Sequence, residues 1–241
     1  MRVTRTYLRQ AFSGTSFRLG VIGTALSLVF ACFSSLLSTL KGQNLPMEAY
    51  YGLFRQAVSS ETLKLILPIV AALPFTASYY DDLHSGFIKE SLPRAGYRKY
   101  LLGKVEACLL SGGMAPVIGV LCFRLIISLA ILPKTAYFTI FWNEVLWAGA
   151  HCLLLFFSGA LWSLVGMTGA ALTNSKYMAY SAPFILFYVL VVLEERYFKR
   201  ITILNPKTWL ETFSSLWVVW LLGAATIFAF LCCGKRRLHR L

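Results

Sequence analysis

Long apolar runs alternate with short polar segments along the whole chain. About 20 consecutive apolar residues are enough to cross a bilayer as a helix. The chain contains six such runs, at residues 19–40, 62–80, 107–132, 145–172, 178–193 and 214–233. Because these runs use up most of the 241 residues, there is little room for a separate soluble domain. The pattern predicts an all-α, polytopic membrane protein in which six transmembrane helices form a single domain over residues 1–241.

Three polar or mixed segments predict structure outside these spans. Residues 1–18 carry four arginines among aromatic and aliphatic side chains, which favours an amphipathic helix on the inner leaflet; a disordered basic tail is the alternative. From Met47 to Val58, apolar residues recur at spacings of four, three and four, which predicts a second amphipathic helix on the outer surface. Residues 194–213 carry both charge signs and a break at Asn205-Pro206, and we expect them to fold back as an extracellular, re-entrant-like segment.

Composition and charge support a membrane location and an orientation. Hydrophobic residues make up 58% of the chain and charged residues 14%, against roughly 25% charged residues in soluble domains. A net charge of +13 could indicate nucleic-acid binding, but the cations lie at helix ends, where lipid headgroups and the positive-inside rule account for them. With the N-terminus inside, inner segments hold 14 of the 23 Lys and Arg residues and outer segments 7. We therefore expect no nucleic-acid partner and both termini in the cytoplasm.

Motifs for catalysis or metal binding are missing from the sequence. The chain contains no H-E-x-x-H, no G-x-S-x-G and no G-x-x-x-x-G-K-[ST], and its six cysteines lie in apolar runs without metal-ligand spacing. We therefore expect no catalytic residue, no metal site and no cofactor in this chain.

Two of the apolar runs contain residues that weaken a helix. Pro68 and Pro74 remove backbone donors from the second run, and Gly112, Gly113 and Pro116 cluster in the third. We expect these five positions to act as hinges.

Two ionisable residues fall within or near the spans and are candidates for a transport path or for packing. Arg124 follows Lys104 by 20 residues, about 30 Å of helix, which places it at the outer interface if the helix enters the bilayer near Lys104. Entry near Cys108 would instead leave it in the hydrocarbon, facing protein or water; we favour the interface. His151 is a functional candidate because it lies in a span, although a hydrogen-bonded packing role is the more frequent one.

The charged segment between the second and third spans holds the most distinctive pattern. In order, it reads Leu73-Pro74-Phe75, Asp81-Asp82, Ser85-Gly86, Leu92-Pro93-Arg94, Arg98-Lys99-Tyr100 and Lys104. Near the last span, Leu204-Asn205-Pro206 is followed by Trp209. This arrangement resembles the ABC-2-type ABC transporter permeases of Gram-positive bacteria. The resemblance covers the six-span plan across nearly all of the chain.

The resemblance implies that residues 81–104 form a cytoplasmic coupling loop whose short helix docks in a separate ATPase subunit. Carried over by position, the coupling residues are Asp81, Asp82, Gly86, Arg94 and Lys104. The chain departs from the family pattern in one respect: it has two aspartates where the family has a Glu beside a basic residue. The alternative for each residue is that it solvates an inner loop or anchors a helix end.

The expected function is that of a permease subunit of an ABC exporter in the bacterial plasma membrane. Its substrate would be a hydrophobic or amphipathic peptide, lipid-like compound or drug, as in antimicrobial peptide resistance, and ATP-Mg would bind the partner ATPase. A second permease, identical or related, would complete the path and pack through small residues of the first span, Gly23, Ala31 and Ser34. The alternative is a non-transporting scaffold or sensor subunit whose inner loop docks another soluble protein.

Overall fold

The structure is a computed structural model, and it describes residues 2–41, 47–88, 96–131, 133, 141–199 and 204–238. Within these ranges every regular element is a helix, so the predicted all-α class is confirmed. The α-helices are α1 (Arg2–Ser13), α2 (Thr15–Ala31), α3 (Phe33–Lys41), α4 (Met47–Val58), α5 (Glu61–Ala72), α6 (Ser78–His84), α8 (Tyr97–Ile131), α9 (Trp142–Thr173), α10 (Lys176–Arg196) and α11 (Leu216–Leu238). Two short 3-10 helices, η3 (Pro206–Leu210) and η4 (Phe213–Ser215), precede α11.

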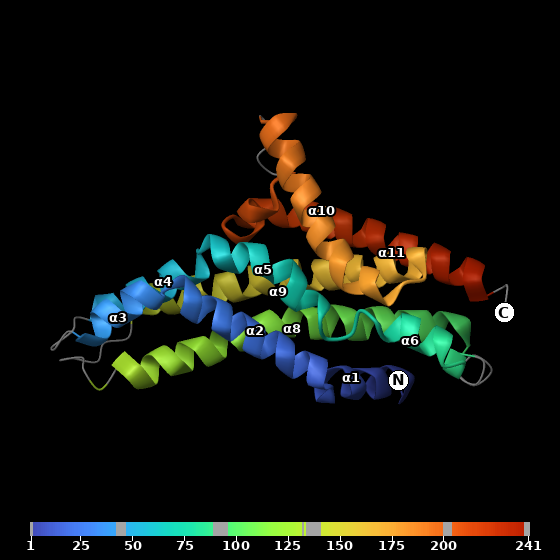
Figure 1. Cartoon of the computed structure of the whole chain (residues 1–241), viewed down its shortest axis with the longest axis horizontal. Coiled ribbons are helices and arrows are strands. Elements are labelled where there is room, and N and C mark those ends of the chain that lie inside the picture. Colours follow the sequence, from blue (N-terminus) through green and yellow to red (C-terminus); the bar gives the residue numbers. More distant parts are fainter. Residues whose placement is uncertain are drawn as a thin grey trace.

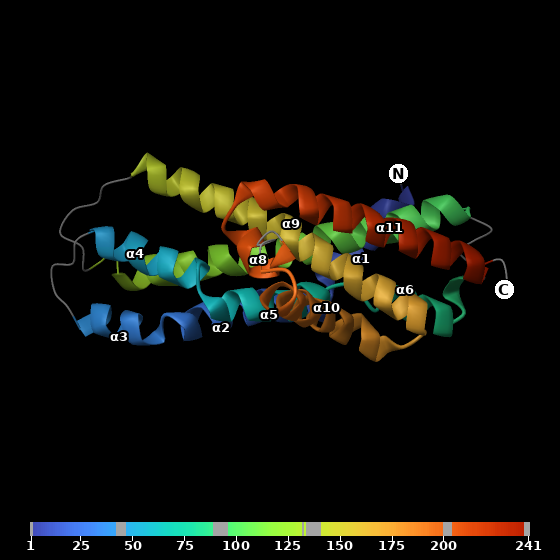
Figure 2. The ribbon, with the colours of Figure 1, turned by 90° about the horizontal axis from the view of Figure 1, so that it is seen from above.

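The helices form an elongated bundle around α8 and α9, which run side by side along its long axis (Figures 1 and 2). Helix α2 packs on α8, and α11 packs on α9. Helix α10 starts beside the end of α9 and projects away from the bundle (Figure 1). We call the end that holds α6 and the start of α8 the inner end, and the end that holds α3, α4 and the start of α9 the outer end.

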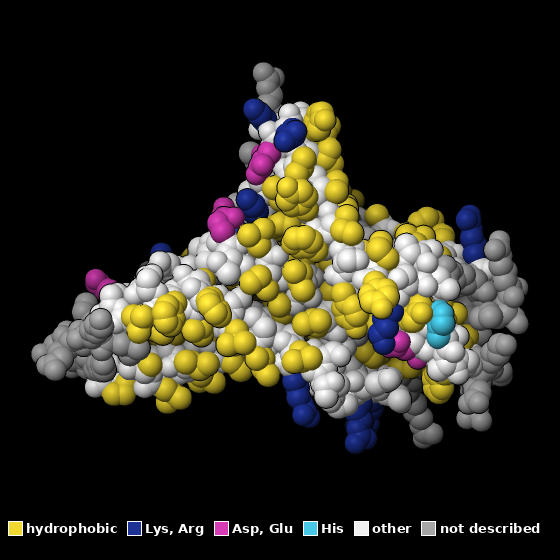
Figure 3. Space-filling model, viewed as in Figure 1, with side chains coloured by type: hydrophobic (Ala, Val, Ile, Leu, Met, Phe, Trp, Pro, Cys, Tyr) yellow, Lys and Arg dark blue, Asp and Glu magenta, His cyan; other side chains and the backbone are white. Residues whose placement is uncertain are grey.

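Four of the described helices are long and apolar enough to cross a membrane. They are α8, α9, α10 and the segment Phe213–Arg236, which covers α11 up to Arg236. Hydrophobic side chains cover much of the visible surface, including the projecting α10 (Figure 3). These helices support a membrane protein, whereas six continuous spans are not confirmed.

The first two apolar runs do not form single straight helices. The first is divided into α2 and α3 at Cys32, and α1 meets α2 at a bend of 53°. The second is broken: α5 ends at Ala72, residues 73–77 form turns, and α6 begins at Ser78. Pro74 lies within these turns and has no backbone N–H to continue the helical hydrogen bonds. Helix α5 has 12 residues, about 18 Å, and is therefore too short to cross the hydrocarbon core alone.

Both segments predicted to be amphipathic are helical. In α1, Tyr7 and Ala11 are buried four residues apart, and α1 lies along α8. In α4, Tyr51, Phe54 and Val58 are buried at the predicted spacing.

The contact between α8 and α9 depends on glycines that let the two backbones approach closely. A Cβ atom added at Gly112 would lie 2.2 Å from the Ser163 Cβ, and one at Gly113 would lie 2.7 Å from the Phe156 ring. On the facing helix, a Cβ at Gly159 would lie 2.7 Å from the Gly112 carbonyl oxygen. The Ser163 hydroxyl also donates a hydrogen bond to the Cys108 carbonyl oxygen at 2.9 Å.

This packing bears on the expected hinges. Helix α8 continues without a break through Gly112, Gly113 and Pro116, all of which are buried, and α5 continues through Pro68. Among the five expected hinge positions, Pro74 alone lies at a break in a helix. The structure thus gives the two glycines a packing role, and movement at all five positions stays a prediction.

Small residues of α2 are used within the chain. A Cβ at Gly23 would lie 3.4 Å from Val70 of α5, and one at Gly119 of α8 would lie 2.5 Å from the Thr24 Cβ. Leu26 and Phe30, three and seven residues after Gly23, expose large apolar side chains, so Gly23 borders the exposed side of α2. Gly23 thus has a neighbour within this chain, and its contact with a second permease stays a prediction.

We predict that Gly112→Ala destabilises the protein, because its new methyl group overlaps Ser163. We expect a loss of about 1–3 kcal/mol, the range for overpacked cores. Gly149→Ala on α9 is the matched control: a Cβ there meets nothing within 4 Å, and alanine favours a helix over glycine by up to about 1 kcal/mol. Unfolding of both variants in detergent micelles measures the difference, and equal stabilities would contradict the packing role.

Candidate functional site

A buried ion pair joins α6 to α8 at the inner end. The Lys104 side chain is fully buried, and its Nζ lies 2.8 Å from Oδ2 of Asp82. The Tyr100 hydroxyl donates a hydrogen bond to the same Oδ2 at 2.8 Å. Tyr100 and Lys104 are four residues apart in α8, so both side chains reach the same face, where α6 lies. One carboxylate of α6 thus binds two consecutive turns of α8.

Aromatic rings complete the surroundings of the Lys104 ammonium. Its Nζ lies 4.7 Å from the ring centre of Tyr7 and 4.8 Å from that of Phe75, distances at which an aromatic face attracts a cation. It also donates to the Ser78 carbonyl oxygen at 3.4 Å. The Tyr7 ring meets the Tyr100 ring edge-on, with centres 6.0 Å apart. The set of Tyr7, Asp82, Tyr100 and Lys104, which we call the inner lock, therefore connects α1, α6 and α8.

The segment that follows α6 lies beside the inner lock and is partly exposed. Asp81 forms a half-exposed ion pair with Lys176 at 2.9 Å, which links α6 to the start of α10. Gly86 has a φ of +74°, a left-handed conformation that glycine adopts without strain. Phe87 is 48% exposed. An open cavity of about 620 Å³ lies between α1 and this segment, lined by Thr6, Tyr7, Gln10, Asp82, Ser85, Gly86 and Phe87.

The predicted coupling residues differ in burial. Asp82 and Lys104 bind each other, and Lys104 is too deeply buried to touch a partner protein in this conformation. Asp81 and Gly86 reach the surface, and Arg94 lies outside the described residues. Sequence analysis missed Tyr7 and Tyr100 as members of the site. The four-residue spacing of Tyr100 and Lys104 was the available signal for Tyr100.

At the outer end of α5, ion pairs connect residues 204–215 to the bundle. The Lys64 Nζ lies 2.6 Å from Glu211 Oε1 and 3.0 Å from Glu61 Oε1, and Lys207 Nζ lies 3.5 Å from Glu61 Oε2. Burial raises the pKa of Glu61, but the hydrogen bonds and charges of Lys64 and Lys207 outweigh this effect and lower it below its ordinary value. In η3, Trp209 is fully buried and stacks on Trp162 of α9 at 5.7 Å. Residues 204–215 therefore fold back onto the bundle, and the extracellular, re-entrant-like placement of residues 194–213 stays a prediction.

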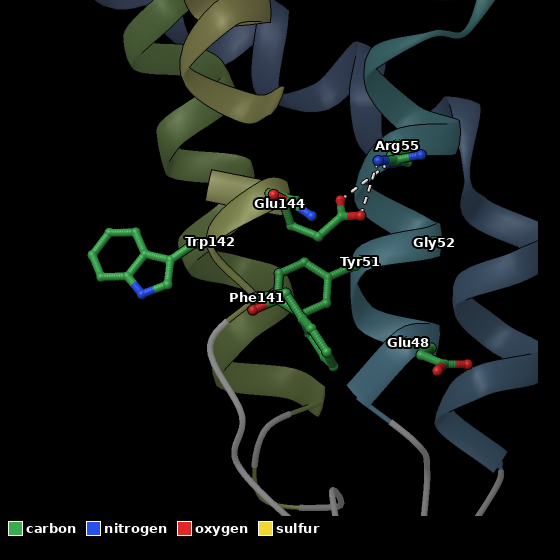
Figure 4. Close-up of a pocket in the computed structure, with 8 residues that line it drawn as sticks. Glu48, Tyr51, Gly52, Arg55, Phe141, Trp142 and Glu144 are labelled. Atoms are coloured by element: carbon green, nitrogen blue, oxygen red, sulfur yellow. Dashed lines mark hydrogen bonds and ion pairs between the residues drawn. The ribbon is translucent and has the colours of Figure 1, made fainter. Parts of the chain in front are cut away.

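A more open site lies between α4 and the start of α9 (Figure 4). We call it the outer pocket; it has a volume of about 490 Å³ and is lined by Glu48, Tyr51, Gly52, Arg55, Phe141, Trp142, Asn143 and Glu144. Arg55 donates two hydrogen bonds to Glu144, at 3.1 and 2.9 Å, and its guanidinium lies 5.0 Å from the Trp147 ring centre. Tyr51 meets Phe141 edge-on at 5.7 Å. The pocket thus combines aromatic rings with a paired charge.

Arg124 and His151 make packing contacts near this pocket. The Arg124 guanidinium lies 5.1 Å from the ring centre of Phe54. The His151 ring lies 3.8 Å from that of Trp147, and its Nδ1 is 3.0 Å from the Trp147 carbonyl oxygen, to which it can donate. These contacts agree with the packing role, and a role in a transport path stays a prediction.

No protein-family model matches this chain, and no curated protein matches it significantly in sequence. Among the described residues, no three His, Cys, Asp or Glu side chains lie close enough together to hold a metal ion.

We predict that the inner lock depends on both of its charges. Lys104→Met leaves the Asp82 carboxylate without its cation and should cost about 3–5 kcal/mol, whereas the double variant Asp82→Leu/Lys104→Met should recover most of that loss. Asp81→Asn is the matched control, because its half-exposed pair with Lys176 contributes about 0–1 kcal/mol. Unfolding in detergent micelles measures all three variants. A Lys104→Met variant as stable as Asp81→Asn would contradict the assignment.

Proposed function

We propose that this chain is the membrane-spanning permease subunit of an ATP-driven exporter whose energy comes from a separate ATPase subunit. The observation that carries the proposal is the inner lock, which fastens the start of the inner loop to the longest helix of the bundle. The resemblance of the loop to ABC-2-type permeases supports the same assignment.

The lock offers a mechanical route from the loop into the bundle. A force applied to the segment after α6 reaches α8 through Asp82 and Lys104, whose short, buried contact resists separation. Helix α8 has 35 residues, about 52 Å, and therefore extends beyond a hydrocarbon core of about 30 Å. At its outer half, Arg124 packs on Phe54 of α4, the helix that also carries Arg55. Displacement of α8 would therefore shift α4, which lines the outer pocket.

The surface around Phe87 is the proposed docking site for the ATPase. Phe87 exposes an aromatic ring beside the cavity between α1 and the loop. Large apolar side chains that fill a pocket on the partner contribute most to binding at protein interfaces. Asp81 and Gly86 lie in the same segment, and the proposal extends to Arg94, which completes the set of coupling residues expected from the sequence.

The remaining parts of the proposal concern the assembly and its cargo. We propose a hydrophobic or amphipathic substrate, such as a peptide, lipid-like compound or drug, and a bacterial plasma membrane location with both termini cytoplasmic. The large exposed apolar surface of α10 and α11 leaves room for a second permease as well as for lipid. ATP-Mg would bind the partner ATPase.

Co-purification tests the proposal. The chain should bring down an ATPase subunit whose hydrolysis rate rises when the membrane subunit is present in lipid nanodiscs. A stable complex with a soluble protein that shows no dependence on nucleotide would instead support the scaffold or sensor alternative.

We predict that Phe87→Asp weakens binding of the ATPase while the protein stays folded. Loss of a central aromatic contact costs about 2 kcal/mol, which corresponds to roughly 30-fold weaker binding. Phe213→Asp is the matched control, because Phe213 is 49% exposed but lies in η4, away from the inner loop. Titration of the ATPase onto each variant measures the affinity. Equal affinities for both variants would overturn the docking site.

A further inference from the structure

An apolar groove runs between α8, α9 and α11, apart from the inner lock and the outer pocket. Its volume is about 520 Å³. Leu110 of α8, Phe157 of α9, and Trp220 and Ile227 of α11 line it, and the rings of Phe157 and Trp220 lie 5.3 Å apart. From Trp220 to Ile227, α11 rises about 10 Å, which is a length suited to an alkyl chain or an extended aromatic group.

One lining residue of the groove is charged. Glu106 of α8 is exposed and lies two residues beyond Lys104, so it marks the end of the groove nearest the inner lock. Within the described ranges, the structure records no ion pair or hydrogen bond for its side chain. A carboxylate on a membrane helix is costly unless it meets water, headgroups or a cation.

The groove differs from an ordinary lipid-facing surface in two respects. It is concave, whereas the outward faces of α2 and α11 present separate, protruding side chains such as Phe30 and Phe228. It also ends at a negative charge, which an uncharged acyl chain does not require. A ligand that matches both features has a hydrophobic body and an ammonium or guanidinium head.

We propose that this groove binds a cationic amphiphile, with its hydrophobic body along Phe157, Trp220 and Ile227 and its cationic head at Glu106. The negative end of the groove lies toward the inner end, so such a ligand would enter from the adjacent leaflet with its head at the membrane surface. The proposal names a substrate class and in that respect rests on the proposed function, although binding itself requires no ATPase.

Gly223 provides a way to fill the groove without disturbing the fold. It lies on α11 in the lining, and a Cβ added there meets nothing within 4 Å. Leucine also favours a helix more than glycine does. Gly223→Leu should therefore occupy space that a ligand needs while leaving the helix intact.

The experiment measures binding of labelled dodecyltrimethylammonium and of uncharged 1-dodecanol to the full chain in nanodiscs of zwitterionic lipid, with empty nanodiscs subtracted. The wild-type protein should bind the cation at least about tenfold more tightly than the alcohol, a difference of about 1.4 kcal/mol. Glu106→Gln should remove this preference and leave dodecanol binding unchanged. Gly223→Leu should weaken binding of both compounds about tenfold or more.

Two matched controls accompany these variants. Glu195→Gln removes an exposed carboxylate at the end of α10, and Gly149→Leu adds the same side chain to another open glycine, on α9. Neither should change binding of either compound.

Three results would overturn the proposal: equal affinity for the cation and the alcohol, which would indicate a lipid groove; a cation preference that survives Glu106→Gln; or binding unaffected by Gly223→Leu. Cation binding at Glu106 without any ATPase stimulation would count against the proposed function alone. ATPase stimulation without cation binding would count against the groove alone.

Discussion

The close approach of α8 and α9 is the constraint on which the rest of the bundle depends. In lipid, apolar side chains gain little by leaving their surroundings for one another, so helices are held by close packing and by interhelical hydrogen bonds. Gly112, Gly113 and Gly159 provide the first, and the Ser163–Cys108 hydrogen bond provides the second. Because α2 packs on α8 and α11 packs on α9, the spacing of this central pair determines where both outer layers lie.

The inner lock fixes the position of α6 along α8. A buried ion pair is weak evidence for stability, because desolvation of both charges offsets their attraction. Its geometry is nevertheless restrictive: Asp82 must meet both Tyr100 and Lys104, and the ammonium must lie between the rings of Tyr7 and Phe75. Apolar packing alone would tolerate a shift of α6 along α8, whereas this arrangement does not.

The helices were largely predictable from the sequence, whereas which of the helix-weakening positions breaks a helix, and which helices pair, were not. Hydropathy treats residues 62–80 as one run because the interruption at Pro74 involves backbone hydrogen bonds and introduces no polar side chain. Glycine both weakens a helix and permits close approach, so Gly112 and Gly113 could not be assigned to hinge or contact without knowledge of Ser163 and Phe156. Lys104 was predicted as a coupling residue. Its buried pair with Asp82 was not predicted, because Asp82 lies 22 positions earlier and periodicity within one helix does not detect it.

Helices α6 and α5 are held in place by different contacts. Helix α6 is fastened to α8 by the inner lock, whereas α5 is held at its other end by the ion pairs of Lys64 with Glu61 and Glu211. Residues 73–77 join the two helices, and Pro74 removes one backbone donor from this connection. Helix α8 is continuous, whereas this turn interrupts the helical hydrogen bonds although residues 74–77 are buried. Among the positions expected to act as hinges, Pro74 is therefore the one at which the helix is broken, and movement there stays a prediction.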